Sequence, residues 1–371
     1  MTPKADIPST APRNRLPTDS LHREPDNDGS LSVDPTLAGW RYLSFRTLRL
    51  AAGETFDLPA DGQETAVVVL GGGGVHVAPE GSAGFPLDGR RSVWDGLPWA
   101  TYLPGGSAAR ITGSPLDHHG SVDIAVARAP SSGRSGVPAT PVLIRPADCV
   151  IEVRGAGNAT RQITHIVPPD FPADRLLLVE VYTPSGNWSS WPPHKHDQDA
   201  MPNEAVLEEV YSYRFRRPAQ DWAIQRVYRR TGTPLYTSSG PRDGLWTVHD
   251  GDTVIVPDGY HPFVTAHGID AYYLNALAGD RRTMACSFDP DLDFVRDAWA
   301  VMDTDPHVPL VDHFGPRPVG VERSTPTGSG RHGSDRSHAG QGQEGMAGDP
   351  GGDPSGQAID LSSKAHERGQ E

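Results

Sequence analysis

Cysteine and long apolar segments are both scarce in this chain of 371 residues. The two cysteines, Cys149 and Cys286, are too few for a disulfide framework or a thiolate metal site, and this favours a reducing cytoplasm. No apolar run approaches the roughly 20 residues that a membrane-spanning helix needs, and the first residues lack the apolar segment of a signal peptide. We therefore expect a cytoplasmic protein that is neither disulfide-rich nor inserted in a membrane.

Positive charge is also in deficit, with 33 Lys and Arg against 47 Asp and Glu and a formal net charge of −14 at pH 7. Nucleic acids and anionic membranes attract basic surfaces, so neither is an expected partner. Hydrophobic residues make up only 36% of the chain, below the share of a wholly globular protein. Parts of the chain are therefore predicted to pack no core.

The chain contains a regular succession of short apolar segments that are separated by turns, or corners, rich in Gly and Pro. Alternation from Tyr42 to Leu50 predicts a half-buried strand, and the apolar run at residues 65–70 predicts a strand buried on both faces. Residues 71–74 are four glycines, but no Lys-Ser/Thr follows and the next segment is another strand, so we predict a tight turn rather than a phosphate loop. The same succession returns in the second half. Many short strands with such corners predict an all-β fold of antiparallel barrels.

Composition divides the chain into five segments. Residues 1–35 are predicted to be a disordered arm, 36–130 a first barrel, 131–145 a linker, 146–300 a second barrel, and 301–371 an extension that is largely a disordered tail. The two tails offer too little periodic apolar surface to offset the entropy of ordering.

The chemistry is concentrated in the heptapeptide Trp191-Pro192-Pro193-His194-Lys195-His196-Asp197. Side chains alternate along an extended strand, so His194 and His196 point to one face and Lys195 to the other. Two imidazoles on one face can bind one metal ion. Histidine pairs occur on many strands, however, and for the pair alone a structural role remains the alternative.

Two downstream features favour the metal. Residues 207–215 form a strand-like run entered by Glu208 and Glu209, and residues 251–261 contain a turn, an apolar strand and a Pro-x-Gly corner that delivers His261. This order is similar to the metal-site pattern of the cupin β-barrels, although twelve residues separate His196 from Glu209 where a generic cupin has three or four. Three imidazoles and one carboxylate suit Zn, Mn or Fe(II) and leave positions open for a substrate.

The first half has the corners of such a barrel but not its ligands. No histidine follows Pro104-Gly105, His76 is isolated, and His118 and His119 lie in a polar loop. We therefore predict that the first barrel binds no metal.

The chain as a whole resembles the bicupin isomerases, which include 5-deoxy-glucuronate isomerase of myo-inositol catabolism. The resemblance spans roughly residues 37–300 and is dense in 150–280. The stretches that carry it are residues 153–162, 182–197, 207–211, 225–228, 257–262 and 272–275. The chain departs from the family with Tyr211-Ser212-Tyr213-Arg214 in place of Tyr-Tyr-His-Arg, at residues 221–224, and at Ala276-Leu277, where Met is usual. The implied fold is a bicupin of two antiparallel jelly-roll β-barrels with disordered N- and C-terminal tails.

The resemblance also implies an activity and a site. The family reaction is a metal-dependent aldose–ketose isomerisation of 5-deoxy-D-glucuronate to 5-dehydro-2-deoxy-D-gluconate. The implied metal ligands are His194, His196, Glu209 and His261. Glu209 is preferred to Glu208 because alternation places it on the side of Tyr211, Tyr213 and Phe215, and because it holds the family's ligand position.

A substrate carboxylate requires a cation, and the planar fork of arginine suits it. Arg226 is our first choice, and Arg161 and Arg154 are the second. Tyr260, Tyr273 and Asn275 are candidate pocket residues with a structural role as an equal alternative. Lys195 faces away from the metal, so its replacement by Met is expected to be milder than loss of a histidine. No general base is assigned.

Three other functions remain open at this stage. They are isomerisation of a related uronate from pectin breakdown, an Fe(II) cupin dioxygenase, and a non-catalytic bicupin that binds sugar acids. The expected partner is a small sugar acid, and the sequence is compatible with a homo-oligomer.

Overall fold

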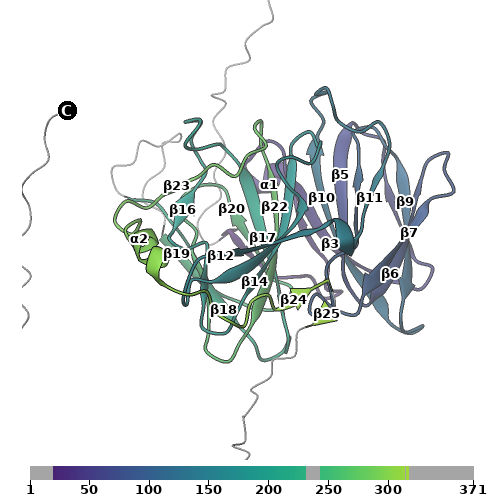
Figure 1. Ribbon diagram of the computed structural model, residues 1–371. Helices are drawn as coiled ribbons and strands as arrows, with labels where there is room; N and C mark the ends of the chain where they lie inside the picture. Colours follow the sequence, from purple (N-terminus) through teal and green to yellow (C-terminus); the bar gives the residue numbers. More distant parts are fainter. Residues whose placement is uncertain (1–19, 231–242, 314, 317–371) are drawn as a thin grey trace, which may run out of the picture. The chain divides into compact units, whose positions relative to one another are not determined.

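The computed structural model describes residues 20–230, 243–313 and 315–316 (Figure 1). The protein is built almost entirely of antiparallel strands, so the expected all-β bicupin class is confirmed. Its helices are single turns at α1 (Pro35–Ala38), α2 (Val295–Ala298), η2 (Pro146–Asp148) and η3 (Trp299–Val301). None of the helices in the described ranges is long and apolar enough to cross a membrane.

The N-terminal barrel consists of two facing sheets. The larger has the order β11 (Val142–Ile144), β8 (Ala100–Leu103), β5 (Gln63–Gly71), β10 (Ser121–Pro130), β3 (Ser44–Ala51) and β2 (Leu31–Val33). The smaller has the order β4 (Thr55–Leu58), β9 (Ala109–Pro115), β6 (Gly73–Pro79) and β7 (Phe85–Arg90). The predicted burial of both faces of β5 is confirmed, because Val67 and Val69 pack inside this barrel while Ala66 and Val68 belong to a second core shared with the other barrel.

The C-terminal barrel repeats this plan. Its larger sheet has the order β1 (His22–Arg23), β20 (Thr253–Val256), β17 (Glu208–Phe215), β22 (Ala271–Ala278), β14 (Leu176–Thr183), β13 (Arg161–Val167) and β12 (Val150–Arg154). Its smaller sheet has the order β15 (Trp188–Ser189), β21 (Phe263–Thr265), β18 (Ala223–Tyr228) and β19 (Asp243–Val248). Two short pairs complete it: β16 (His194–Lys195) with β23 (Ser287–Phe288), and β24 (Val311–Asp312) with β25 (Gly315–Pro316).

Residues 20–35 differ from the expected disordered arm. Strand β1 extends the larger sheet of the C-terminal barrel by pairing with β20, and β2 pairs with β3 of the N-terminal barrel. The Asp34 carboxylate then accepts a hydrogen bond from the Leu37 backbone N–H at 2.8 Å and caps α1. The pairing of β1 depends on a partner more than 200 residues along the chain, which local composition does not register. Residues 1–19 of the predicted arm lie outside the described residues.

The linker and the C-terminal extension are also more structured than expected. Within residues 131–145, β11 pairs with β8 and adds an edge strand to the N-terminal barrel. In the extension, the Gln162 side chain donates to the Val311 carbonyl at 2.7 Å and accepts from the Leu310 N–H at 2.8 Å. Residues 317–371 of the predicted tail lie outside the described part of the chain.

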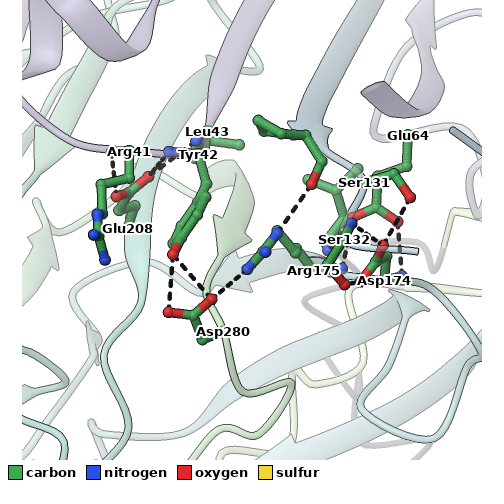
Figure 2. A network of polar contacts seen from close by, with 12 residues as sticks. Arg41, Tyr42, Leu43, Glu64, Ser131, Ser132, Asp174, Arg175, Glu208 and Asp280 are labelled. Atoms are coloured by element: carbon green, nitrogen blue, oxygen red, sulfur yellow. Dashed lines mark hydrogen bonds and ion pairs between the residues drawn. The ribbon is translucent and has the colours of Figure 1, made fainter. Parts of the chain in front are cut away.

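Two carboxylates join the barrels reciprocally, as Figure 2 shows. Glu208 of the C-terminal barrel accepts from the backbone N–H groups of residues 41, 42 and 43 at 2.6–2.9 Å. Glu64 of the N-terminal barrel accepts from those of residues 174, 175 and 176 at 2.6–2.8 Å. A buried ion pair between Arg90 and Glu180 adds a third tie. Each carboxylate thus satisfies three N–H groups that would otherwise lack partners at the interface.

Candidate metal centre

Three histidines from two segments converge in the C-terminal barrel. His194 and His196 come from β16 and the residue after it, and His261 comes from the corner between β20 and β21. One ring nitrogen of each lies within 4.8 Å of the others. The corner needs Gly259 because its φ is +85° and a side chain there would meet the Tyr228 carbonyl oxygen at 2.5 Å.

Glu209 completes the donor set. Its Oε2 lies 2.8 Å from Nε2 of His196 and 3.3 Å from Nε2 of His261. The alternation of β17 turns Glu209 toward the histidines and Glu208 toward the other barrel, as the sequence predicted. All four predicted ligands are therefore brought together.

Backbone carbonyls orient two of the imidazoles. Nδ1 of His196 lies 3.1 Å from the Leu207 carbonyl oxygen, and Nδ1 of His261 lies 2.9 Å from that of Gly259. Since a carbonyl only accepts, each Nδ1 carries a proton, and Nε2 of the neutral His261 ring presents a lone pair. Nε2 of His261 is buried and makes no hydrogen bond within the described residues. A buried ring nitrogen without a hydrogen-bond partner is suited to bind a metal ion.

The protonation states of two of the three rings fit as well, whereas at His196 burial is outweighed by the hydrogen bond to Glu209, which raises its pKa. Burial lowers the pKa of His261 to about 4, and burial with the neighbouring imidazoles holds the pKa of His194 well below its usual value. Both rings are thus neutral at pH 7, which is the form that binds metal. The three-histidine group can hold a divalent ion, and Glu209 supplies one negative charge beside it.

A cavity of about 930 Å³ opens over this group. Strands β12 and β13, the heptapeptide and the segment around α2 line it, with side chains that include Arg154, Arg161, Trp191, Phe288, Asp293 and Trp299. The segment around α2 was noted in the sequence only as a short helix. Its role in the cavity wall depends on how the chain returns after β23, which local periodicity does not reveal.

Three arginines of the described chain line the cavity, and two of them are paired, Arg154 with Glu152 and Arg296 with Asp293, which leaves Arg161 as the third. It is 6% exposed, donates from Nη1 to the Ala159 carbonyl at 3.0 Å, and lies 5.8 Å from the Trp299 ring. Among the residues that the structure describes it has no carboxylate partner. Burial and the nearby Arg154 lower its pKa to about 10, so it remains charged at pH 7. A buried, unpaired guanidinium beside a metal donor set is suited to bind a carboxylate.

Arg226, the first choice from the sequence, lies elsewhere. Its guanidinium forms two 2.8 Å hydrogen bonds with Asp243 and lies 4.2 Å from the Tyr228 ring, and its side chain is 44% exposed. Strand β18 points Gln225 inward, where its amide donates to the His261 carbonyl at 2.9 Å, so the next residue must point outward. The structure therefore places Arg226 on the outer surface, away from the cavity that Arg161 lines, and Gln225 on the inner face of the strand.

The other candidate pocket residues do not line this cavity, and their contacts are structural. The Tyr273 hydroxyl donates to Ser189 at 2.9 Å, the Asn275 amide donates to the Val210 carbonyl at 3.1 Å, and the Tyr260 ring packs on Tyr228 with centroids 5.3 Å apart. Tyr273 and Asn275 thus support β15 and β17 behind the metal centre.

Comparisons with known proteins agree with this geometry. A family model described as the KduI/IolB family matches residues 20–295. The 5-deoxy-glucuronate isomerase of Geobacillus kaustophilus (strain HTA426) is 37% identical over 276 residues, which are 74% of this chain and 93% of that protein. The one from Bacillus subtilis (strain 168) is 37% identical over 251 residues, 67% of this chain and 86% of that protein. The crystal structure of an IolB-like protein from Salmonella typhimurium LT2 is similar with a TM-score of 0.66 and 34% identity, over 74% of this chain and 99% of that chain.

Fold and site together define a bicupin with one clustered set of metal donors. The chain belongs to the KduI/IolB family, and it is an enzyme, an isomerase of this family. The match begins at residue 20, so β1 and β2 lie within the region that the family model covers.

Proposed function

We propose that this enzyme is a metal-dependent aldose–ketose isomerase that converts 5-deoxy-D-glucuronate to 5-dehydro-2-deoxy-D-gluconate in myo-inositol catabolism. The observation that carries the proposal is the placement of a three-histidine, one-glutamate donor set and the unpaired Arg161 in one cavity. A sugar acid with an aldehyde at one end and a carboxylate at the other matches these two features. The names of the relatives support the same substrate.

The reaction moves a proton from the carbon beside the aldehyde to the aldehyde carbon, and the proton of the hydroxyl on that neighbouring carbon to the aldehyde oxygen, so no electrons leave the substrate. His194, His196, Glu209 and His261 would hold a divalent Zn, Mn or Fe ion, which supplies Lewis acidity toward the carbonyl oxygen. Arg161 binds the distant carboxylate and so orients the sugar, which converts binding energy into alignment at the reacting carbons. The side chains of Trp191, Phe288 and Trp299 form an apolar part of the cavity wall, which limits the access of water to the protein's charged groups in the cavity.

The test combines metal analysis of the purified protein with isomerase assays under anaerobic conditions. We expect about one equivalent of metal per chain and turnover of 5-deoxy-D-glucuronate without oxygen. Oxygen-dependent product formation would instead indicate a dioxygenase, and preference for a pectin-derived uronate would indicate the related isomerase. Tight sugar-acid binding without turnover in metal-loaded protein would indicate a binding protein.

We also propose a cytoplasmic location. Cys149 and Cys286 are both free thiols, and burial raises the pKa of each, to about 12 and about 11. Two unpaired, unreactive thiols fit a reducing compartment. Fractionation of cells that produce the protein tests this.

A further inference from the structure

Lys195 stands between the two ligand histidines in sequence but does not share their face. Its side chain is buried, with 5% of the residue exposed. Its Nζ donates to Oδ1 of Asp197 at 2.7 Å and to both oxygens of Glu204 at 2.8 and 2.9 Å. Lys195, Asp197 and Glu204 therefore form a buried ion cluster, which we call the lysine triad, directly behind the metal centre.

The lysine triad contacts every segment that bears a histidine ligand. Asp197 Oδ2 accepts a hydrogen bond from the Gly259 N–H at 2.9 Å, and the Gly259 carbonyl in turn accepts from Nδ1 of His261. Lys195 lies on the strand that carries His194 and His196. An unbroken series of hydrogen bonds thus runs from the two-histidine strand to the third histidine.

The loop between His196 and Glu209 is tied into the same cluster. Oε1 of Glu204 accepts hydrogen bonds from the backbone N–H groups of Asp197 and Gln198, both at 2.8 Å. At the end of the loop, the Leu207 N–H donates to the His196 carbonyl at 3.0 Å, and the Leu207 carbonyl lies beside the His196 ring. The unusually long insertion relative to a generic cupin therefore supplies Glu204, the acid that pairs with Lys195.

We propose that Lys195, Asp197 and Glu204 are positioning residues that hold the two-histidine strand in register with the corner carrying His261, and so pre-form the metal donor set. The inference rests on the proposed metal-dependent function and concerns the affinity of the site rather than the reaction. Removing a hydrogen bond that supports a metal ligand typically weakens metal binding 10- to 100-fold. The sequence-based expectation that Lys195→Met is mild does not follow from this structure, because that change leaves the buried Glu204 carboxylate and the partly buried Asp197 carboxylate without their cation.

The central experiment compares two losses of a buried cation in the full-length chain. Lys195→Met removes the cation of the lysine triad, and Arg90→Met removes the cation of the interbarrel pair with Glu180. The probe is Co²⁺, titrated into metal-free protein and followed by its visible absorption, with melting temperature measured alongside. We expect both variants to melt roughly 5 °C or more below wild type.

Only Lys195→Met is expected to weaken Co²⁺ binding, by roughly 10- to 100-fold, and to alter the Co²⁺ absorption bands. A purely structural role would lower both melting temperatures and leave Co²⁺ affinity and bands unchanged. Equal Co²⁺ affinity in Lys195→Met and wild type overturns the inference.

A gentler variant covers the case in which Lys195→Met does not fold. Asp197→Asn keeps the size of the side chain and removes its charge at the link to Gly259, and we expect a roughly 10-fold loss of Co²⁺ affinity. Unchanged Co²⁺ affinity in this variant overturns the inference and leaves the proposed isomerase intact. Wild-type protein that binds no metal at all overturns both.

Discussion

The two barrels share a strand plan yet differ at the position of the metal ligand. In the C-terminal barrel, Glu209 lies opposite Val256 and Leu277 on its neighbouring strands. In the N-terminal barrel, the residue with the matching neighbours is Thr65, which lies opposite Leu103 and Arg128. The residues just before them, Glu208 and Glu64, make the same reciprocal contacts with the other barrel. One position has therefore kept the same role in both barrels, while the next has diverged.

The difference shows how the first barrel has no room for such a site. Nε of Arg128 donates to the Thr65 hydroxyl at 3.1 Å, and its Nη2 pairs with Asp61 at 2.6 Å. Arg128 stands where the C-terminal barrel has Leu277, which lines the cavity. In the N-terminal barrel, the Arg128 guanidinium, paired with Asp61 and bonded to Thr65, therefore takes the place that the acidic Glu209 and the cavity wall at Leu277 have in the C-terminal barrel.

Replacing Glu209, the residue at which the two barrels differ, should give the largest effect. Glu209→Gln removes the one anionic ligand, and we expect isomerase activity to fall by at least about 1000-fold with greatly weakened metal binding. The matched change Thr65→Val should leave about one metal per chain and near wild-type turnover. Metal analysis and steady-state kinetics measure both. If Glu209→Gln kept its metal and activity, or Thr65→Val lost them, the assignment of the site to one barrel would be wrong.

Arginine replacement sharpens the contrast between a cavity and an outer surface. Arg161→Leu should raise KM by roughly 10- to 100-fold, since a charge-assisted bond to a carboxylate contributes about 1.5–3 kcal/mol. Arg226→Leu, which breaks an exposed pair with Asp243, should change KM less than about twofold and stability by less than about 1 kcal/mol. Substrate titrations of the two variants decide between the arginines. A large KM effect at Arg226 alone would restore the sequence-based choice.

The shared position should respond alike in both barrels. Glu64→Gln and Glu208→Gln each place an amide N–H₂ group against backbone N–H donors, and each should cost about 2–4 kcal/mol of unfolding free energy. Glu64 also accepts from the Tyr102 hydroxyl at 2.6 Å. Urea unfolding measures each loss. Losses below about 0.5 kcal/mol would show that the reciprocal contacts do not stabilise the interface.

The smallest effect concerns acid. Burial raises the pKa of Asp174, but hydrogen bonds from Ser132 and Ser131 outweigh it, and the pKa lies below its ordinary value of 3.8. A depressed carboxyl pKa adds stability above the unfolded pKa, and that stability is lost as pH falls below about 4. Asp174 is the first of the three residues whose N–H groups donate to Glu64, and the matching first donor to Glu208 is Arg41, which has no carboxyl group. Of these two matching residues, only Asp174 therefore makes its contact sensitive to acid. Asp174→Asn should flatten the dependence of unfolding free energy on pH between about 5 and 3, and an unchanged slope would assign it to other carboxyls.

Much of the fold and of the donor set was predictable because strand alternation and corner spacing are local properties. His194, His196, Glu209 and His261 followed from a period of two and from Pro-x-Gly corners, and the structure brings all four together. The family resemblance added the choice of Glu209. These signals survive in sequence because a strand that faces a site must repeat every second residue.

What could not be predicted depends on contacts between distant segments. The pairing of β1 with β20 joins residues more than 200 positions apart, and nothing in the composition of the arm marks it. The choice between Arg226 and Arg161 depended on which face of β18 turns inward, and an isolated Gln-Arg pair fits either register. Lys195 faces away from the ligands as alternation predicted, but its acidic partner lies in a loop without periodicity.

The reciprocal carboxylates carry a consequence for how the chain holds itself together. In an isologous interface, a first surface of one half contacts a second surface of the other half, and the reverse contact is made as well. Two-fold symmetric dimers have interfaces of this form. Strand β1 crosses between the halves as well, since it joins the sheet edge of the C-terminal barrel while β2, the next strand in sequence, pairs within the N-terminal barrel. The protein is in this sense a dimer whose two subunits are covalently joined. Joining them raises the effective concentration of each half for the other.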